Sequence, residues 1–176
     1  ILFLSCGVVR IMRRPFGEMP FRAAGSAGGR FPLEFYAAIP EGSDLPAGVH
    51  WYDAMAHQLV TIGPPPIGGG PALVVTGVPW RTGWQYRERG YRHIYWDAGT
   101  ALSQTLAAAE SAGIAAALYS VFPDREVSEL AGADGTHEFP VAVVALTQRA
   151  ATVTPGGPAV AGRVDESPIQ FPLVTA

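Results

Sequence analysis

Two segments of the sequence concentrate the side chains that could do chemistry. The first runs from Tyr86 to Gly99 and packs arginine, histidine, aromatic and acidic residues into an otherwise weakly charged chain. The second runs from Arg22 to Tyr36 and places a turn of small residues directly before an apolar run. Such a turn can bring backbone amides close to a flat or anionic ligand. Both segments are therefore candidate parts of one ligand-binding site.

The small-residue turn offers several kinds of hydrogen-bond donor. Ser26 supplies a hydroxyl, and the neighbouring Gly25, Gly28 and Gly29 supply backbone amides. Arg22 and Arg30 flank the turn with guanidinium groups, which bind phosphate in a bidentate way. The same residues also suit an ordinary tight turn before a strand, with solvated arginines at its ends. The sequence leaves these two interpretations open.

Tyr86 is the side chain of the other segment best suited to donate or position a proton. Arg89 and His93 stand four residues apart, so they share one face of a helix. Asp97 stands four residues beyond His93, and this spacing predicts a stabilising pair worth roughly 0.3 kcal/mol. A solvated first turn of a helix is the alternative interpretation of this segment.

The composition excludes several classes of function. All twelve basic residues are arginine, so the chain has no lysine for a P-loop, a Schiff base or a general base. The net charge of −3 argues against a nucleic-acid-binding protein. The four histidines and the single cysteine, Cys6, are scattered without the spacing of metal ligands, so no metal site is expected.

The cysteine content and the apolar opening bear on where the protein works. Cys6 cannot form a disulfide within the chain, which favours a reducing compartment such as the cytoplasm. The apolar run of residues 1–9 precedes its arginines instead of following them, unlike a signal peptide. It is also far shorter than the roughly 20 residues that a membrane helix needs. We therefore expect a cytoplasmic protein with no membrane partner.

Turn signals divide the chain into short strands and a few helices. A helix is predicted over residues 1–12 and a loop over 13–30, followed by strands at 33–39, 48–53, 57–62 and 72–78. A long helix is predicted from Tyr86 to Ala112, ended by Gly113, and then a strand at 114–121, a short helix at 124–130 and a strand at 139–147. This order predicts an α+β fold: a mixed, mostly antiparallel sheet flanked by helices, one of them long and central. We assign residues 1–148 to one domain and residues 149–176 to a linker or extended arm.

Four pieces of the sequence stand in a recognisable order and spacing: the serine-alanine-glycine turn with its Glu-x-Tyr strand at 26–36, the hairpin at 47–59, the segment at 86–99, and residues 122–138. Together they resemble the nitroreductase-like flavoprotein superfamily, and within it the SagB-type (streptolysin-type) peptide dehydrogenases. The resemblance covers residues 1–148. It implies a nitroreductase-like fold that binds flavin mononucleotide (FMN) noncovalently where two such domains meet.

The resemblance also implies an activity and partners. SagB-type enzymes oxidise azoline rings to azoles in a ribosomally made precursor peptide, with FMN as the electron acceptor. The implied partners are that peptide, a cyclodehydratase complex, and a second nitroreductase-like domain in a homodimer or in a tandem protein of which this chain is the first half. Tyr86 is the implied catalytic residue. The residues expected to bind the flavin are Arg22, Ser26, Ala27, Gly28 and Arg30.

The chain departs from the family pattern in two places. Where active members carry a lysine-tyrosine pair, this chain has Gln85 and Tyr86. The arginine-rich segment that holds the flavin phosphate lies upstream of the first helix in the family, and Arg13-Arg14-Pro15 does not match it. Two alternatives therefore remain: a general NAD(P)H-dependent nitroreductase-like enzyme, and a non-catalytic half-domain that completes the flavin site of a partner.

Overall fold

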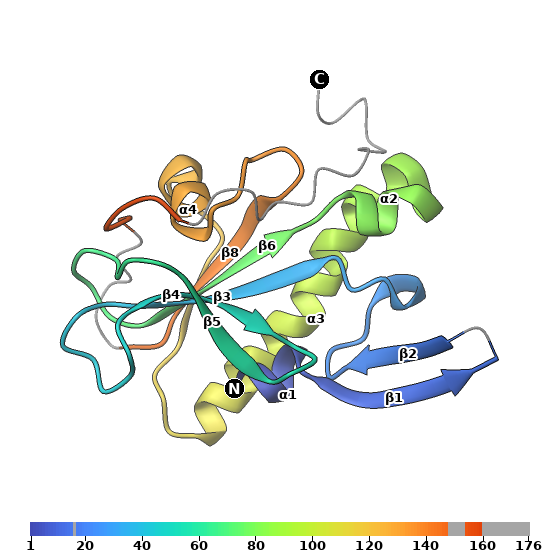
Figure 1. The fold of residues 1–176 in the computed structure, drawn as a ribbon, viewed down its shortest axis with the longest axis horizontal. Coiled ribbons are helices and arrows are strands. Elements are labelled where there is room, and N and C mark those ends of the chain that lie inside the picture. The colour runs from blue at the N-terminus through green and yellow to red at the C-terminus, as the bar shows by residue number, and fades with distance from the viewer. Residues whose placement is uncertain (16, 148–153, 160–176) are drawn as a thin grey trace.

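A six-stranded sheet forms the centre of the protein (Figure 1). The computed structural model describes residues 1–15, 17–147 and 154–159. The strand order is β5-β4-β3-β6-β8-β7, and each neighbouring pair is antiparallel. The strands are β3 (Leu33–Ile39), β4 (Gly48–Asp53), β5 (Gln58–Gly63), β6 (Ala72–Gly77), β7 (Ala117–Tyr119) and β8 (Phe139–Ala145).

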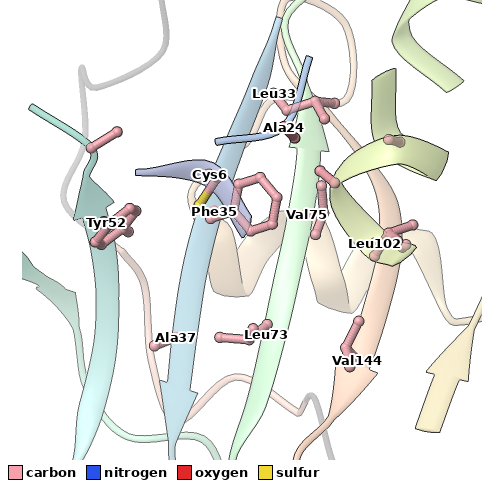
Figure 2. Packing of buried hydrophobic residues seen from close by; sticks show 14 of the residues in the cluster. Cys6, Ala24, Leu33, Phe35, Ala37, Tyr52, Leu73, Val75, Leu102 and Val144 are labelled. Atoms are coloured by element: carbon pink, nitrogen blue, oxygen red, sulfur yellow. The ribbon is translucent and has the colours of Figure 1, made fainter. Parts of the chain in front are cut away.

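Helices cover both faces of this sheet because its central strands are apolar on both sides. Every residue of β3 and β6 is buried. Side chains alternate across a strand, so Phe35 lies in one apolar cluster and Tyr36 in the other. The first cluster also receives Leu102 of α3 and Cys6 of α1, as Figure 2 shows. The second receives residues of α4. The helices are α1 (Leu2–Cys6), α2 (Trp80–Tyr86), α3 (Gly90–Ser111) and α4 (Asp124–Ala131).

The predicted α+β fold with a long central helix is confirmed. Strands β3 and β4 have the predicted bounds, and α4 extends the predicted helix by a single residue. Gly113 follows the end of α3 with a φ of 69°, as the predicted helix end requires. No helix in the described part of the chain is long and apolar enough to cross a membrane.

The predicted helix over residues 1–12 is wrong beyond Cys6. The chain continues as β1 (Val8–Arg14), which pairs with β2 (Gly17–Arg22) in a two-stranded ribbon that extends to one side of the sheet (Figure 1). The loop predicted for residues 13–30 is therefore wrong over most of its first half. Val8, Val9 and Ile11 are β-branched and favour a strand once a partner strand is available.

The predicted start of the long helix is also wrong. Tyr86 ends α2 instead of beginning α3, and a 3-10 turn at Arg87–Arg89 separates the two helices. Arg87 has a φ of 51°, which a continuous helix does not allow. The strand predicted over residues 114–121 is reduced to β7, because this edge strand pairs with β8 at three positions.

The predicted linker lies largely outside the described residues. Its described part, residues 154–159, lies beside the loop after β5: the Ile67 amide donates a hydrogen bond of 3.0 Å to the carbonyl of Thr154. Gly156 lies so close to Pro65 that an added Cβ would be 2.0 Å from the proline carbonyl oxygen. The assignment of residues 149–176 to an arm stays a prediction.

The buried cysteine leads to a prediction about reactivity. Burial raises the pKa of the Cys6 thiol from 9.0 to about 12. The thiolate is the reactive form, so we expect iodoacetamide at neutral or mildly alkaline pH to label the folded chain at least about 100-fold more slowly than the urea-unfolded chain. Because the pKa is raised on folding, this group's contribution to stability is complete below the unfolded pKa and is lost as the pH rises toward 12. Equal labelling rates for the folded and unfolded chains would contradict this burial.

Candidate functional site

Asp97 of α3 holds the turn that precedes β3. Ser26 Oγ donates a hydrogen bond to Asp97 Oδ2 at 2.5 Å, and the Ala27 amide donates to Asp97 Oδ1 at 3.0 Å. The Phe31 amide in turn donates to Ser26 Oγ at 2.8 Å. Asp97 is buried, with 6% of its surface exposed. These three hydrogen bonds therefore hold the turn against α3.

The turn brings Gly28 against Tyr86. Gly28 has a φ of 59°, and a Cβ built on it would lie 2.5 Å from Tyr86 Oη. Gly29 also has a positive φ, of 65°. Two successive left-handed residues suit glycine because no Cβ is present to clash. The hydroxyl of Tyr86 thus lies over bare backbone, and two residues 58 positions apart in sequence meet at one place.

Alanine in place of Gly28 tests this close approach. The new Cβ would displace the Tyr86 hydroxyl, and the left-handed backbone would be strained. We expect the free energy of unfolding to fall by about 1–2 kcal/mol, measured by urea denaturation. Gly25→Ala is the matched control, because its Cβ would meet no atom within 4 Å and its φ is not positive. Equal stability of the two variants would contradict the contact.

Arg30 links the turn to the end of α2. Its Nε donates a hydrogen bond of 2.6 Å to Gln85 Oε1, and its guanidinium lies 4.3 Å from the centre of the Trp84 ring. This distance is that of a cation–π contact. Among the described residues neither Nη of Arg30 has a hydrogen-bond partner. Gln85 and Trp84 therefore hold the Arg30 side chain in position, and its Nη groups can donate hydrogen bonds to a ligand.

Arg22 lies on the inner side of the turn. Its Nη1 donates a hydrogen bond of 2.8 Å to the Leu33 carbonyl, and its guanidinium lies 5.8 Å from the centre of the Phe31 ring. It lines a small pocket together with Cys6 and Asp97. In this turn Ser26 and Ala27 thus bind Asp97, Gly28 lies against Tyr86, and Arg30 contacts the end of α2. Arg22 lines the pocket beside Asp97.

A second set of polar contacts positions α2, and with it Tyr86. Arg81 Nη1 lies 2.5 Å from Glu34 Oε1 in an ion pair, and Trp51 Nε1 donates to Glu34 Oε2 at 2.9 Å. The Glu34 side chain is only 8% exposed. These contacts join α2 to β3 and β4, so the sheet itself holds the helix that carries Tyr86.

The predicted pair of His93 and Asp97 is wrong. Both nitrogens of the His93 ring are buried and have no hydrogen-bond partner among the described residues. The ring stacks on Tyr86 instead, with centroids 4.3 Å apart and planes 14° apart. Asp97 binds the turn because the Ser26 hydroxyl and the Ala27 amide reach its two oxygens. The spacing of four residues places His93 and Asp97 on one face of the helix. It does not reveal that the turn at Ser26 and Ala27, far away in sequence, binds Asp97 instead.

These residues fit part of a flavin. Gly28 offers exposed backbone, and Arg30 offers Nη donors that have no partner among the described residues. Both suit the carbonyl oxygens and polar edge of an isoalloxazine ring. The Ser26 hydroxyl and the Ala27 amide already bind Asp97, and their contact with a flavin stays a prediction. A search of the described residues for three or more clustered histidine, cysteine, aspartate or glutamate side chains that could hold a metal ion found none.

Sequence reasoning did not find three features of this site. Asp97 was assigned to the wrong partner, and the contacts of Arg30 with Gln85 and Trp84 were not foreseen. Glycines with a positive φ are typical of a close approach, so the paired glycines of the turn carried a signal. The sequence does not predict that Tyr86 is the neighbour of these glycines, because Tyr86 lies far from them along the chain.

Comparisons with known proteins agree with this fold. The model of the nitroreductase family matches residues 52–147. A protein of Methanocaldococcus jannaschii that bears the name of a nitroreductase is 26% identical over 145 residues, which are 74% of this chain and 70% of that protein. A solved structure from Anabaena variabilis, also named as a nitroreductase, is 28% identical with a TM-score of 0.76, and covers 82% of this chain. This chain spans only 33% of that one.

Two further solved structures share the fold at lower identity. One is the E. coli microcin synthetase McbBCD complex with truncated pro-MccB17 bound, at 19% identity and a TM-score of 0.68, covering 83% of this chain and 60% of that one. The other, from Ralstonia eutropha, is named as a nitroreductase, at 20% identity and a TM-score of 0.67, covering 85% and 70%. Because the family match spans more than half of the sequence, the chain belongs to the nitroreductase family.

Proposed function

We propose that this chain is one half of an FMN-dependent oxidoreductase of the SagB type, which oxidises azoline rings to azoles in a ribosomally made peptide. The observation that carries the proposal is the contact of Gly28 with the hydroxyl of Tyr86. It joins the turn expected to meet the flavin to the residue expected to handle a proton. Membership of the nitroreductase family supports a flavin-dependent oxidoreductase.

Arg30 and Gly28 are the residues that would hold the flavin ring from this chain. The guanidinium of Arg30 would donate to ring carbonyl oxygens, and the exposed backbone at Gly28 would let the ring approach closely. Bound FMN would supply the two-electron acceptor that aromatisation of an azoline requires.

Tyr86 would handle the proton that this oxidation releases. Aromatisation removes two electrons and two protons from the ring, and one hydrogen leaves with the electron pair. The second hydrogen leaves a ring carbon as a proton, and the phenol oxygen of Tyr86 would accept it. The phenol's own proton would pass to solvent in the same step. Its half-buried position beside the exposed Gly28 would leave the hydroxyl open to both a substrate and water.

A second nitroreductase-like domain is the proposed partner that supplies the phosphate site. Arg13 and Arg14, the nearest candidates in sequence, lie exposed on the β1–β2 ribbon, and Arg13 pairs with Glu18 at 3.1 Å. The fold also occurs in the McbBCD complex, whose solved structure holds a truncated pro-peptide. That neighbour supports a peptide substrate and a synthetase complex as partners of this chain. A cyclodehydratase within such a complex is proposed from the resemblance to SagB-type enzymes alone.

Purification with and without a second nitroreductase-like domain tests the proposal. We expect the complex to carry the visible absorbance of oxidised flavin, to release FMN on denaturation, and to remove two hydrogens per azoline ring from a cyclised precursor peptide, measured by mass spectrometry. Flavin in the complex without oxidation of the peptide would contradict the SagB-type activity. A complex without flavin would favour a half-domain with no catalytic role.

A general nitroreductase-like enzyme is the second candidate, favoured by the names of the M. jannaschii and A. variabilis proteins. Such an enzyme would take electrons from NAD(P)H and pass them to a small electrophile. The discriminating measurement is the oxidation of NADPH by the flavin-loaded complex in the presence of a nitroaromatic compound. Turnover there, with none on the azoline peptide, would replace the first proposal by this one.

A further inference from the structure

Thr82 of α2 carries a buried hydroxyl that bonds to the neighbouring helix instead of its own. The residue is 1% exposed, and its Oγ1 donates a hydrogen bond of 3.2 Å to the carbonyl of Gly90, the first residue of α3. A threonine within a helix ordinarily bonds to a carbonyl three or four residues before it, as Thr105 does to Ala101 at 2.9 Å. The Thr82 hydroxyl therefore helps to place α2 against α3.

This hydrogen bond lies one helical turn from Tyr86. Thr82 and Tyr86 stand four residues apart in α2, so they share the face of that helix that meets α3. Their partners, Gly90 and His93, stand three residues apart and share one face of α3. The hydrogen bond joins the first pair of residues, and the ring stack at 4.3 Å joins the second. Together the two contacts set the position of the Tyr86 phenol, whose hydroxyl lies against Gly28.

The turn between α2 and α3 is strained, so contacts on either side of it must hold it. Arg87 has a φ of 51° and a ψ of −138°, and a residue with a side chain keeps such a conformation only where the surrounding structure imposes it. The side chains of residues 87–89 are exposed and make no hydrogen bond or ion pair among the described residues. The hydrogen bond from Thr82 to Gly90 spans this turn and keeps its two ends together.

We infer that Thr82 is a positioning residue for azoline oxidation, an inference that rests on the proposed function. Its hydroxyl holds α2 against the start of α3, and thereby holds the Tyr86 phenol against Gly28, where the phenol would accept a proton from the ring. Thr82 itself is too deeply buried to touch the peptide or the flavin. A reacting group displaced by about 1 Å can lose about 100-fold in rate, so a small shift of α2 is enough to impair Tyr86.

The first test compares two variants of Thr82 in the complex with the second domain. Thr82→Val removes the hydroxyl and keeps the size of the side chain. We expect it to lower kcat for azoline oxidation about tenfold or more and to leave KM and the FMN content within about twofold, because Thr82 touches neither ligand. Thr82→Ser keeps the hydroxyl, and we expect its kcat to stay within about threefold of wild type. The rates are measured by mass spectrometry of the peptide over a range of peptide concentrations.

Thr105→Val is the matched control for the loss of a buried hydroxyl. Thr105 is fully buried in α3, several turns beyond His93, and its hydroxyl bonds only within that helix. We expect its kcat to stay within about twofold of wild type, as for a change away from the chemistry.

The second test needs no activity and uses the whole chain. Trypsin cuts after arginine, and Arg87 and Arg89 are exposed in the turn. We expect cleavage after these two residues to be about fivefold faster in Thr82→Val than in wild type, because one hydrogen bond no longer holds the ends of the turn together. Cleavage after Arg10, which is exposed on β1, serves as the reference in the same digest and is expected to be unchanged.

Three results would each overturn the inference. The first is a kcat of Thr82→Val equal to that of Thr105→Val, and the second is equal cleavage of the turn in wild type and Thr82→Val. The third is a Thr82→Ser variant as slow as Thr82→Val, because the hydroxyl would then not be the group that positions Tyr86. If Thr82→Val does not fold, Thr82→Cys replaces it, since a thiol is only a weak hydrogen-bond donor.

The proposed function fails in a different way. A wild-type complex that oxidises no azoline contradicts the proposed function, and the trypsin comparison then still decides whether Thr82 holds the turn. A Thr82→Val complex that oxidises the peptide as fast as wild type would sustain the proposed function and reject the role of Thr82.

Discussion

Under the proposed function, replacing Tyr86 with phenylalanine is expected to lower the turnover of the flavin-loaded complex by about 100- to 10,000-fold, the range of a lost proton-transfer group. The change removes only the hydroxyl that lies over Gly28 and keeps the ring that stacks on His93. We therefore expect the fold and the FMN content to be retained while the rate of peptide oxidation falls. The rate is measured by mass spectrometry of the peptide under conditions of saturating substrate.

Tyr95→Phe is the matched control for this variant. Tyr95 lies in α3 and is exposed, and its hydroxyl contacts that of Tyr91 at 3.0 Å instead of the turn. We expect its loss to leave turnover within about twofold of wild type, as for a surface change away from the chemistry. A Tyr86→Phe enzyme that keeps full turnover would exclude a proton-transfer role for the hydroxyl.

The second large expected effect is a loss of stability when Asp97, which holds the turn at Ser26 and Ala27, is replaced. Asp97→Ala is expected to lower the free energy of unfolding by about 3 kcal/mol, because it removes two hydrogen bonds to a buried carboxylate and leaves their donors unpaired. The Ser26 hydroxyl and the Ala27 amide would lose their shared partner. We expect the flavin content of the complex to fall as well, because the turn that presents Gly28 is then no longer fixed.

Urea denaturation compares this variant with two others. Glu110→Ala removes an exposed carboxylate from the same helix, and a change within about 0.5 kcal/mol is expected. Asp97→Asn keeps one acceptor for the Ala27 amide but turns an amide donor toward Ser26, so an intermediate loss is expected. If Asp97→Ala were no less stable than Glu110→Ala, the hydrogen bonds to the turn would not stabilise the fold.

The elements that could be predicted from sequence are those whose local pattern and tertiary setting agree. Strand β3 is a continuous apolar run after a turn, and a central strand covered by helices on both faces requires that pattern. Gly113 ends α3 because a residue with positive φ follows the last turn. The β1–β2 ribbon could not be predicted in this way, since a strand at Val8–Arg14 depends on a partner that begins only at Gly17.

The family, the order of the central elements and the two segments of the candidate site could all be predicted from the amino-acid sequence. This is because these features depend on local patterns: apolar runs, glycine turns and the grouping of polar residues. Which atoms of these segments are in contact depends on the three-dimensional packing. Whether Asp97 binds His93 or Ser26, and whether Tyr86 lies over Gly28, depends on the packing of α2 and α3 against the turn. Such contacts join residues about 60 to 70 positions apart, and no spacing along a chain encodes them.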